Sequence, residues 1–124
     1  MTPLLQVALG GALGASGRYL TTTAVARLMG KSFPWGTMTV NVLGSFAMGV
    51  LVVLLAHFSG NRFAPLLMTG VLGGFTTFSA FSLDAATLYE RGQVGPAAAY
   101  ILASVILSVM ALFAGLWFAR SLTT

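Results

Sequence analysis

The chain has 124 residues, of which 57% are hydrophobic and only 6% charged, and its mean hydropathy is +0.93. Soluble domains carry about a quarter charged residues, and a chain this short cannot bury so much apolar surface in a core of its own. The composition therefore predicts an integral membrane protein in contact with the lipid bilayer. Cysteine is absent, which excludes disulfides and thiolate metal sites, and the net charge of +4 comes from scattered residues, which argues against nucleic-acid binding.

Four hydrophobic stretches follow one another along the chain, at residues 4–26, 35–58, 65–89 and 96–119. Each is near the roughly 20 residues that an α-helix needs to cross a bilayer. The first lacks the basic start and cleavage site of a secretory signal, so we expect it to be retained as a helix. The connections are short and have turn chemistry. We therefore predict one all-α domain over 1–124, with four antiparallel transmembrane helices.

Small residues recur at helical spacing in the first two stretches, as Gly10 and Gly14 and then as Ser45 and Gly49. Such spacing lets helices approach closely in lipid, where packing replaces the hydrophobic effect. The pattern fits contacts within one subunit and contacts between subunits equally well.

Basic residues are divided almost evenly between the two sides of the predicted bundle. Arg62 and Arg120 fall on the side of both termini, while Arg27, Lys31 and Arg91 fall on the other. Orientation in the membrane follows the bias of such charges, and here the bias is small. The chain could insert both ways, which would permit an antiparallel homodimer.

The third stretch contains two adjacent glycines followed by hydroxyl and aromatic residues, over positions 73–82. Irregular backbone survives in a bilayer only inside protein or beside a polar cavity. We therefore expect the third helix to be interrupted near 73–77, with the functional site at the interruption. Freed carbonyls would suit a hard cation such as Na⁺, and freed amides would suit an anion.

Polar side chains inside the other predicted spans are the next candidates, because they are costly in lipid and tend to be functional. Asn41 could donate to an anion or form a hydrogen bond between helices. Arg18 could extend to the membrane surface or attract anions in a water-filled vestibule. Tyr100, Ser104 and Ser108 are spaced by four, which places three hydroxyls on one helical stripe.

Aromatic residues recur every third position in the third stretch, as Phe75, Phe78 and Phe81. An aromatic stripe is usually packing, yet the positive edge of a phenyl ring can also contact an anion.

An enzymatic constellation is not found in the sequence. The single histidine, His57, comes at the end of the second stretch and is interpreted as an interfacial residue. The two carboxylates, Asp84 and Glu90, have no partner at metal-ligand or catalytic spacing. We expect the protein not to be an enzyme.

Three motifs, in this order, resemble the Fluc (CrcB) family of fluoride channels. They are Gly-Arg-Tyr at 17–19, Trp-Gly-Thr-Met-Thr-Val-Asn at 35–41, and Gly-Val-Leu-Gly-Gly-Phe-Thr-Thr-Phe-Ser-Ala-Phe-Ser at 70–82. The likeness covers essentially the whole chain. It has two departures, since Ala80 stands where a hydroxyl residue is common and Asp84 where a glutamate is common.

The resemblance implies an antiparallel, dual-topology homodimer in the bacterial inner membrane that conducts fluoride passively out of the cell through two pores. It also implies a central, structural Na⁺ that is not transported and is held by the backbone carbonyls of Gly73 and Thr76 from each subunit. Arg18 would lie near the aqueous end of the path. The residues expected along the path are Asn41, Thr77, Phe78, Ser79, Phe81, Tyr100, Ser104 and Ser108.

Two other functions compete with this one. A proton-coupled exporter of small cations also forms dual-topology dimers, but it needs a carboxylate within the membrane, for which Asp84 is the only candidate. A non-transporting assembly factor would need none of the polar residues. Residue types alone do not distinguish fluoride from chloride.

Overall fold

The computed structural model describes residues 2–59 and 62–124, and these ranges are helical apart from short connections. The helices are α1 (Pro3–Met29), α2 (Trp35–Leu54), η1 (Leu55–Ser59), η2 (Pro65–Leu72), α3 (Gly73–Phe75), α4 (Ser79–Glu90) and α5 (Val94–Thr123), of which η1 and η2 are π-helical. Neither range contains a strand, in agreement with the predicted all-α class. The turn expected at 59–62 lies partly outside the described residues.

Three stretches of the described chain are long and apolar enough to cross a membrane, namely Trp35–Phe58, Pro65–Glu90 and Val94–Thr123. They correspond to the second, third and fourth predicted spans. α1 has 27 residues, which is long enough, but it does not reach the same hydropathy. Gln6, Arg18 and three consecutive threonines lower its apolar character.

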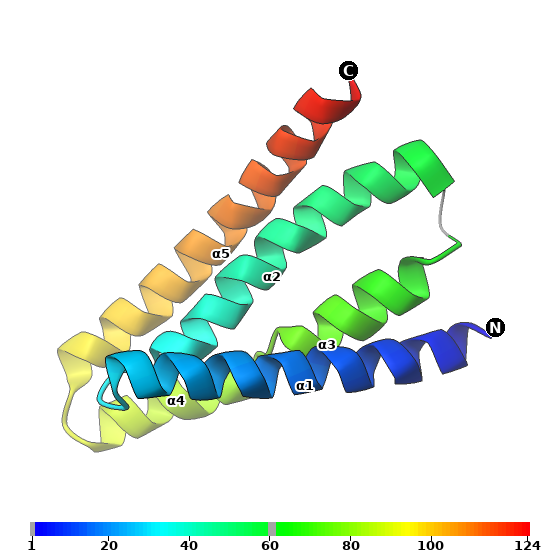
Figure 1. The fold of residues 1–124 in the computed structure, drawn as a ribbon. Helices are drawn as coiled ribbons and strands as arrows, with labels where there is room; N and C mark the ends of the chain where they lie inside the picture. The colour runs from blue at the N-terminus through cyan, green and yellow to red at the C-terminus, as the bar shows by residue number, and fades with distance from the viewer. Residues whose placement is uncertain (1, 60–61) are drawn as a thin grey trace.

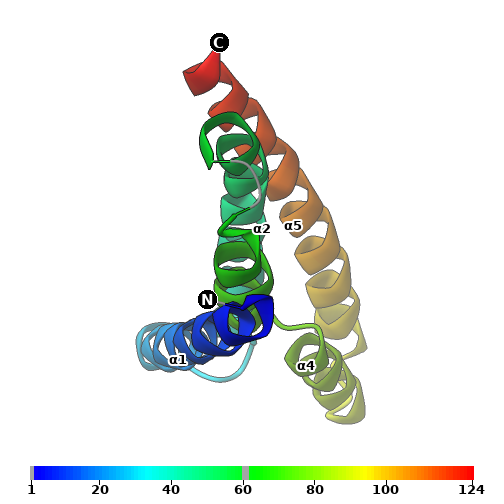
Figure 2. The same ribbon diagram turned by 90° about the vertical axis from the view of Figure 1, so that its right-hand side faces the viewer.

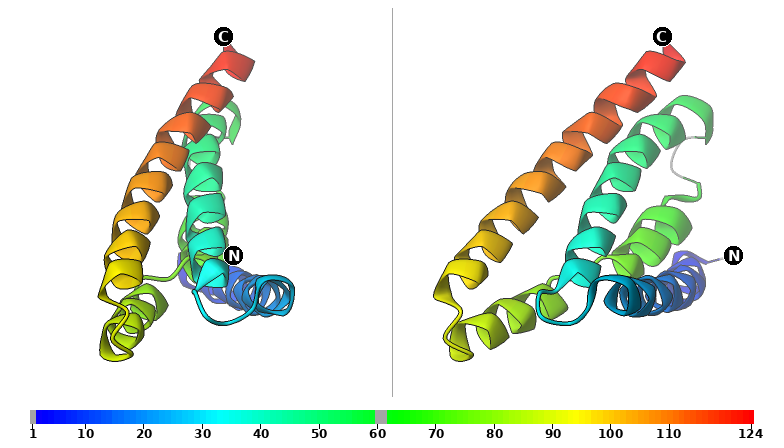
Figure 3. Two further views of the ribbon diagram at one scale, coloured as in Figure 1. Left: turned by 90° about the vertical axis from the view of Figure 1, so that its left-hand side faces the viewer. Right: turned by 60° about the vertical axis from the view of Figure 1, so that its left-hand side comes forward.

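The helices pack in two groups. Figure 1 shows α2 and α5 side by side and α1 inclined to them, while η2 and α3 pack against α1, and Figure 2 gives the view along α1. The C-terminus, the start of α1, the end of η1 and the start of η2 lie toward one end of the molecule (Figure 1 and Figure 3). The links from α1 to α2 and from α4 to α5 lie toward the other end, so the helices alternate in direction as expected.

Close packing within the chain explains the small residues of α1. A Cβ at Gly10 would collide with the carbonyl oxygen of Leu66 in η2, and a Cβ at Gly14 would collide with that of Val71. The backbones of α1 and η2 therefore approach too closely for any side chain between them. The question left open by the sequence is answered for these two glycines, which pack within the subunit.

Glycines also allow α2 and α5 to pack closely against each other. A Cβ at Gly49 would meet the carbonyl oxygen of Leu112, and one at Gly115 would meet that of Phe46. The two helices are thus in direct backbone contact at this level, which holds the α2–α5 layer together.

The interruption of the third span lies at residues 76–78, which we call the break, and not at the two glycines. Gly73 and Gly74 are helical, whereas Thr76 has an extended backbone with φ −86° and ψ 159°. Gly74 is small for a different reason, because a Cβ there would lie 2.8 Å from the carbonyl oxygen of Gly11 in α1. The prediction of a break near 73–77 therefore began three residues too early, and the two ranges overlap at residues 76 and 77.

Threonine chemistry explains why the chain turns at the break. The Thr77 hydroxyl accepts a hydrogen bond from the backbone N–H of Ala80 at 3.1 Å. A threonine that accepts from the N–H three residues later is the usual cap of a helix N-terminus. Thr77 therefore starts α4 as a new helix after α3 has ended.

Candidate functional site

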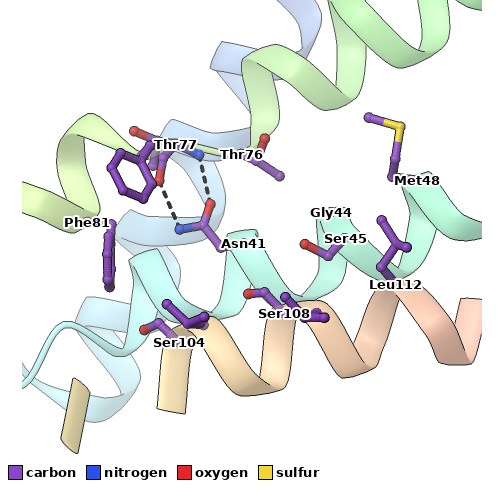
Figure 4. A pocket seen from close by; sticks show the side chains of 13 residues that line it. Asn41, Gly44, Ser45, Met48, Thr76, Thr77, Phe81, Ser104, Ser108 and Leu112 are labelled. Carbon is purple, nitrogen blue, oxygen red and sulfur yellow. Dashed lines mark hydrogen bonds between the residues drawn. The ribbon is translucent and has the colours of Figure 1, made fainter. Parts of the chain in front are cut away.

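A cavity of about 360 Å³ lies between α2, α5 and the break, and it is open on one side (Figure 4). None of the residues that line it in the described chain is charged. They are Asn41, Gly44, Ser45 and Met48 of α2; Thr76, Thr77, Phe78 and Phe81 of the break and α4; and Ser104, Val105, Ser108, Val109 and Leu112 of α5.

Asn41 joins α2 to the break through both polar atoms of its side chain. Its Nδ2 donates to the carbonyl of Thr77 at 2.9 Å, and its Oδ1 accepts from the N–H of Thr77 at 2.7 Å (Figure 4). An amide is the only neutral side-chain group that can both donate and accept in this way. The interhelical hydrogen bond considered for Asn41 is thus present, and Asn41 also lines the cavity.

The break leaves several carbonyls without their ordinary helical donors. In an uninterrupted helix, the N–H of Thr77 would bond the carbonyl of Gly73, and the N–H of Ala80 would bond that of Thr76. Here the N–H of Thr77 donates to Asn41, and the N–H of Ala80 donates to the Thr77 hydroxyl. The carbonyls of Gly73 and Thr76 are therefore among those released by the break.

A third carbonyl at the break is bound by Arg18. Its Nε donates to the carbonyl of Gly74 at 3.1 Å, in place of the N–H of Phe78 that an unbroken helix would supply. A cation at this position also interacts favourably with the carboxyl end of the helix dipole. Arg18 is half-buried and is not among the residues that line the cavity.

The two phenylalanines that line the cavity differ in their surroundings. Phe81 is buried, with 8% of its surface exposed, between the ring of Phe78 at 5.4 Å and that of Tyr100 at 5.2 Å. Phe78 is 76% exposed. Phe81 is therefore fixed by the fold of one subunit, whereas much of Phe78 is uncovered.

The predicted hydroxyl stripe of α5 divides into two parts. Ser104 and Ser108 line the cavity, and their oxygen atoms are buried without a hydrogen-bond partner in the described chain. Tyr100 is fully buried behind Phe81 and donates to Oδ2 of Asp84 at 3.3 Å. Neither Tyr100 nor Asp84 is among the lining residues, so the one carboxylate that an exporter could use lies outside the cavity.

Most of the predicted path residues are brought together around the cavity, with two exceptions. Asn41, Thr77, Phe78, Phe81, Ser104 and Ser108 line it, whereas Ser79 and Tyr100 do not. Arg18, which was expected near the aqueous end of the path, also lies outside the cavity. The exposed Ser79 lies 3.4 Å from the Thr77 hydroxyl, measured between the two oxygens.

Sequence reasoning missed two residues of the α2 wall, Gly44 and Ser45. A Cβ at Gly44 would collide with the methyl group of Thr76, so this glycine is what lets the break approach α2. Ser45 follows Asn41 by four residues, and that spacing could have placed it on the same face.

These features define a helical membrane protein in which an uncharged cavity, lined in part by an amide and several hydroxyl groups, lies beside an interrupted helix. Irregular backbone at membrane depth is tolerated where it lines such a cavity, and ion channels and transporters use it to bind ions.

Comparison with known proteins identifies the family. The model of the family described as CrcB-like protein, Camphor Resistance (CrcB), matches residues 5–116. A protein of Cereibacter sphaeroides (strain ATCC 17029 / ATH 2.4.9) named fluoride-specific ion channel FluC is 71% identical over 116 residues, which cover 94% of this chain and 93% of that protein. A protein of Chelativorans sp. (strain BNC1) with the same name is 60% identical over 124 residues, covering 98% and 99%.

The chain therefore belongs to the CrcB-like family, and the resemblance seen in its motifs is confirmed. The family is one of ion channels and not of enzymes, as expected from the sequence.

Proposed function

We propose that this protein is a fluoride-specific ion channel, which lets fluoride leave the cell passively and so limits its cytoplasmic concentration. The relatives that match nearly its whole length carry that name. The observation that carries the proposal is the cavity, which offers an amide and several hydroxyls without any charged lining residue in the described part of the chain. A cavity whose lining offers hydrogen-bond donors and no carboxylates favours the binding of an anion over that of a cation.

Fluoride is small and strongly hydrated, so its path must replace bound water with many hydrogen-bond donors. The hydroxyls of Ser104 and Ser108 are available for this, because they have no partner among the described residues. A buried hydroxyl without a partner is unfavourable by about 1–3 kcal/mol. An anion in the cavity would accept from both and remove this penalty.

The aromatic wall would complete the path. Phe78 and Phe81 both line the cavity, and a ring edge carries a partial positive charge that can face an anion. Tyr100 would act by supporting the Phe81 ring, against which it packs. Thr77 and Ser79 would add hydroxyls at the start of α4, where their oxygens lie together.

A homodimer would close the cavity, which in one subunit is open on one side. Phe78 is largely exposed beside this opening, and an exposed aromatic residue is suited to an interface between subunits. The nearly even distribution of basic residues would allow two copies to insert in opposite orientations in the inner membrane of a bacterium. Two identical cavities would then give the dimer two paths.

In this proposal α1 crosses the bilayer as a fourth span in spite of its lower hydropathy. Its polar residues are turned toward the protein, since Gln6 is buried, with its Oε1 accepting from the N–H of Leu66, and Arg18 bonds Gly74. A polar side chain that faces a neighbouring helix is much less unfavourable than one that faces lipid.

The break also has the chemistry of a Na⁺ site. Carbonyl oxygens are suitable ligands for this hard cation, and those of Gly73 and Thr76 have lost their helical donors. The same two carbonyls from each subunit would hold a structural Na⁺ at the dimer centre. The ion would supply positive charge that binds the two breaks together and would not be transported.

Reconstitution tests the proposal. The purified protein in liposomes loaded with potassium fluoride should release fluoride passively once valinomycin balances the charge, and chloride should leave far more slowly. Removing Na⁺ should reduce the fluoride efflux. Equal efflux of the two anions would contradict the fluoride proposal, absence of any efflux would favour an assembly factor, and cation efflux that dissipates a proton gradient would favour an exporter.

A further inference from the structure

Several serine and threonine hydroxyls in the spans are satisfied within their own helix. The hydroxyls of Thr22, Thr39, Ser82 and Thr87, outside the cavity, and that of Thr76, which lines it, each donate to the carbonyl four residues earlier, at 2.7 to 3.0 Å. A hydrogen bond to the carbonyl of the preceding turn is the ordinary partner of a serine or threonine hydroxyl within a helix. It leaves the hydroxyl proton unavailable to anything else.

The three serines that line the cavity do not follow this pattern. Ser45, Ser104 and Ser108 form no hydrogen bond with any residue of the described chain. All three lie in regular helices, where a carbonyl four residues earlier is within reach. Their protons are therefore available to a ligand in the cavity.

Ser45 lies on the wall opposite the α5 serines. It follows Asn41 by one helical turn, so the two side chains face the same way, and Ser108 lies across from it on α5 (Figure 4). The lining residues that follow along the two helices are Met48 on α2 and Val109 and Leu112 on α5, which are apolar. Ser45 is thus the last hydroxyl of the α2 wall.

We propose that Ser45 is a further residue of the ion path, and that its hydroxyl donates to the permeating anion from α2 while Ser108 donates from α5. This inference rests on the proposed function and extends it. A stripe on α5 alone would approach the anion from one side only. Donors on both walls surround a small anion more completely, as replacing its water requires.

Three variants test the role of Ser45. Ser45→Ala should slow fluoride efflux about tenfold, which corresponds to the loss of one hydrogen bond to an ion. Ser45→Thr keeps the hydroxyl and should stay within about twofold of the unchanged protein on the same scale. Thr39→Val is the matched control, since Thr39 is on the same helix but bonds back to Trp35 outside the cavity, and its efflux should not change.

The melting temperature of each variant in detergent separates the proposed role from a folding defect. Ser45→Ala and Ser45→Thr should both melt at the temperature of the unchanged protein, because Ser45 has no hydrogen bond to lose within the described chain. A melting temperature that falls in step with the efflux would overturn the proposal.

The flux outcomes separate this inference from the function on which it rests. If the unchanged protein releases fluoride and Ser45→Ala matches it within about twofold, the role of Ser45 is wrong while the channel stands. Ser45→Thr as slow as Ser45→Ala would also overturn the role, because the hydroxyl would then not be the determinant. If the unchanged protein releases no fluoride, the proposed function itself fails.

Discussion

Asn41 and Thr77 are paired across two helices by two hydrogen bonds, with Nδ2 donating to the Thr77 carbonyl and the Thr77 N–H donating to Oδ1. The pairing fixes the orientation of the amide, because the reverse orientation would place donor against donor. One hydrogen of Nδ2 is used by Thr77, and the amide has a second. Holding the break and donating to an anion are therefore compatible roles for the same side chain.

Replacement of Asn41 tests this pairing. Asn41→Ala removes the partner of both backbone groups of Thr77, and we expect the free energy of unfolding to fall by about 1–3 kcal/mol for each unmade bond. Fluoride efflux should fall at least about tenfold, since a donor to the anion is lost as well. Chemical unfolding in detergent and efflux from liposomes measure the two effects. Gln93→Ala, at an exposed amide outside the cavity, should change neither.

Gly44 should tolerate no side chain. The methyl group of Gly44→Ala would collide with the Thr76 methyl and lie 3.4 Å from the Phe75 ring, so the break would have to move away from α2. Overpacking of this kind destabilises by about 1–3 kcal/mol. We expect a lower melting temperature and slower efflux.

The control for Gly44 is Gly11→Ala in α1, where no atom beyond its chain neighbours and its own helix backbone lies within 4 Å of the added methyl. Alanine is favoured over glycine in a helix, so this variant should be as stable as the unchanged protein or more so. Equal behaviour of the two variants would show that the close approach of Gly44 to the break does not matter.

Arg18 should be required for the order of the break. Arg18→Ala leaves the Gly74 carbonyl without its donor, so backbone amides at 76–80 should exchange faster with deuterated solvent. Arg18→Gln can still donate to this carbonyl and should exchange at an intermediate rate. Arg27→Ala, at an exposed arginine of the same helix, is the control. If Arg18 acts only as a charge in a vestibule, both variants would lose efflux without a change in exchange.

Replacement of Phe78 and replacement of Phe81 should differ in their effect on the stability of the subunit, while both should slow fluoride efflux. Phe81→Ala opens a hole between Phe78 and Tyr100, and large-to-small changes of a buried aromatic residue cost about 3–5 kcal/mol. Phe78→Ala should destabilise the subunit much less, because Phe78 is mostly exposed. Both should slow fluoride efflux, as should Phe81→Ile, which keeps an apolar side chain without the ring edge. Rapid efflux by Phe81→Ile would exclude a role of the ring edge.

The sequence grouped the residues around the cavity better where the signal was local. Ser104 and Ser108 follow from helical spacing, and both line the cavity. Tyr100 belongs to the same stripe but lies outside the cavity, and its contact with Asp84 depends on how α4 packs against α5. The two glycines suggested the break, but both are helical, and the small size of Gly74 serves the contact of α3 with α1.

Composition and motifs by themselves determined that the protein is helical, embedded in a membrane and a member of a channel family. The reason is local, since a bilayer requires each span to be apolar and to satisfy its own backbone. Only the tertiary structure decided where the third span breaks, which carbonyls it releases and that Ser45 joins the cavity. These features depend on side chains of α1 and α2 that bond residues 36 to 56 positions away, and no pattern within one helix encodes such contacts.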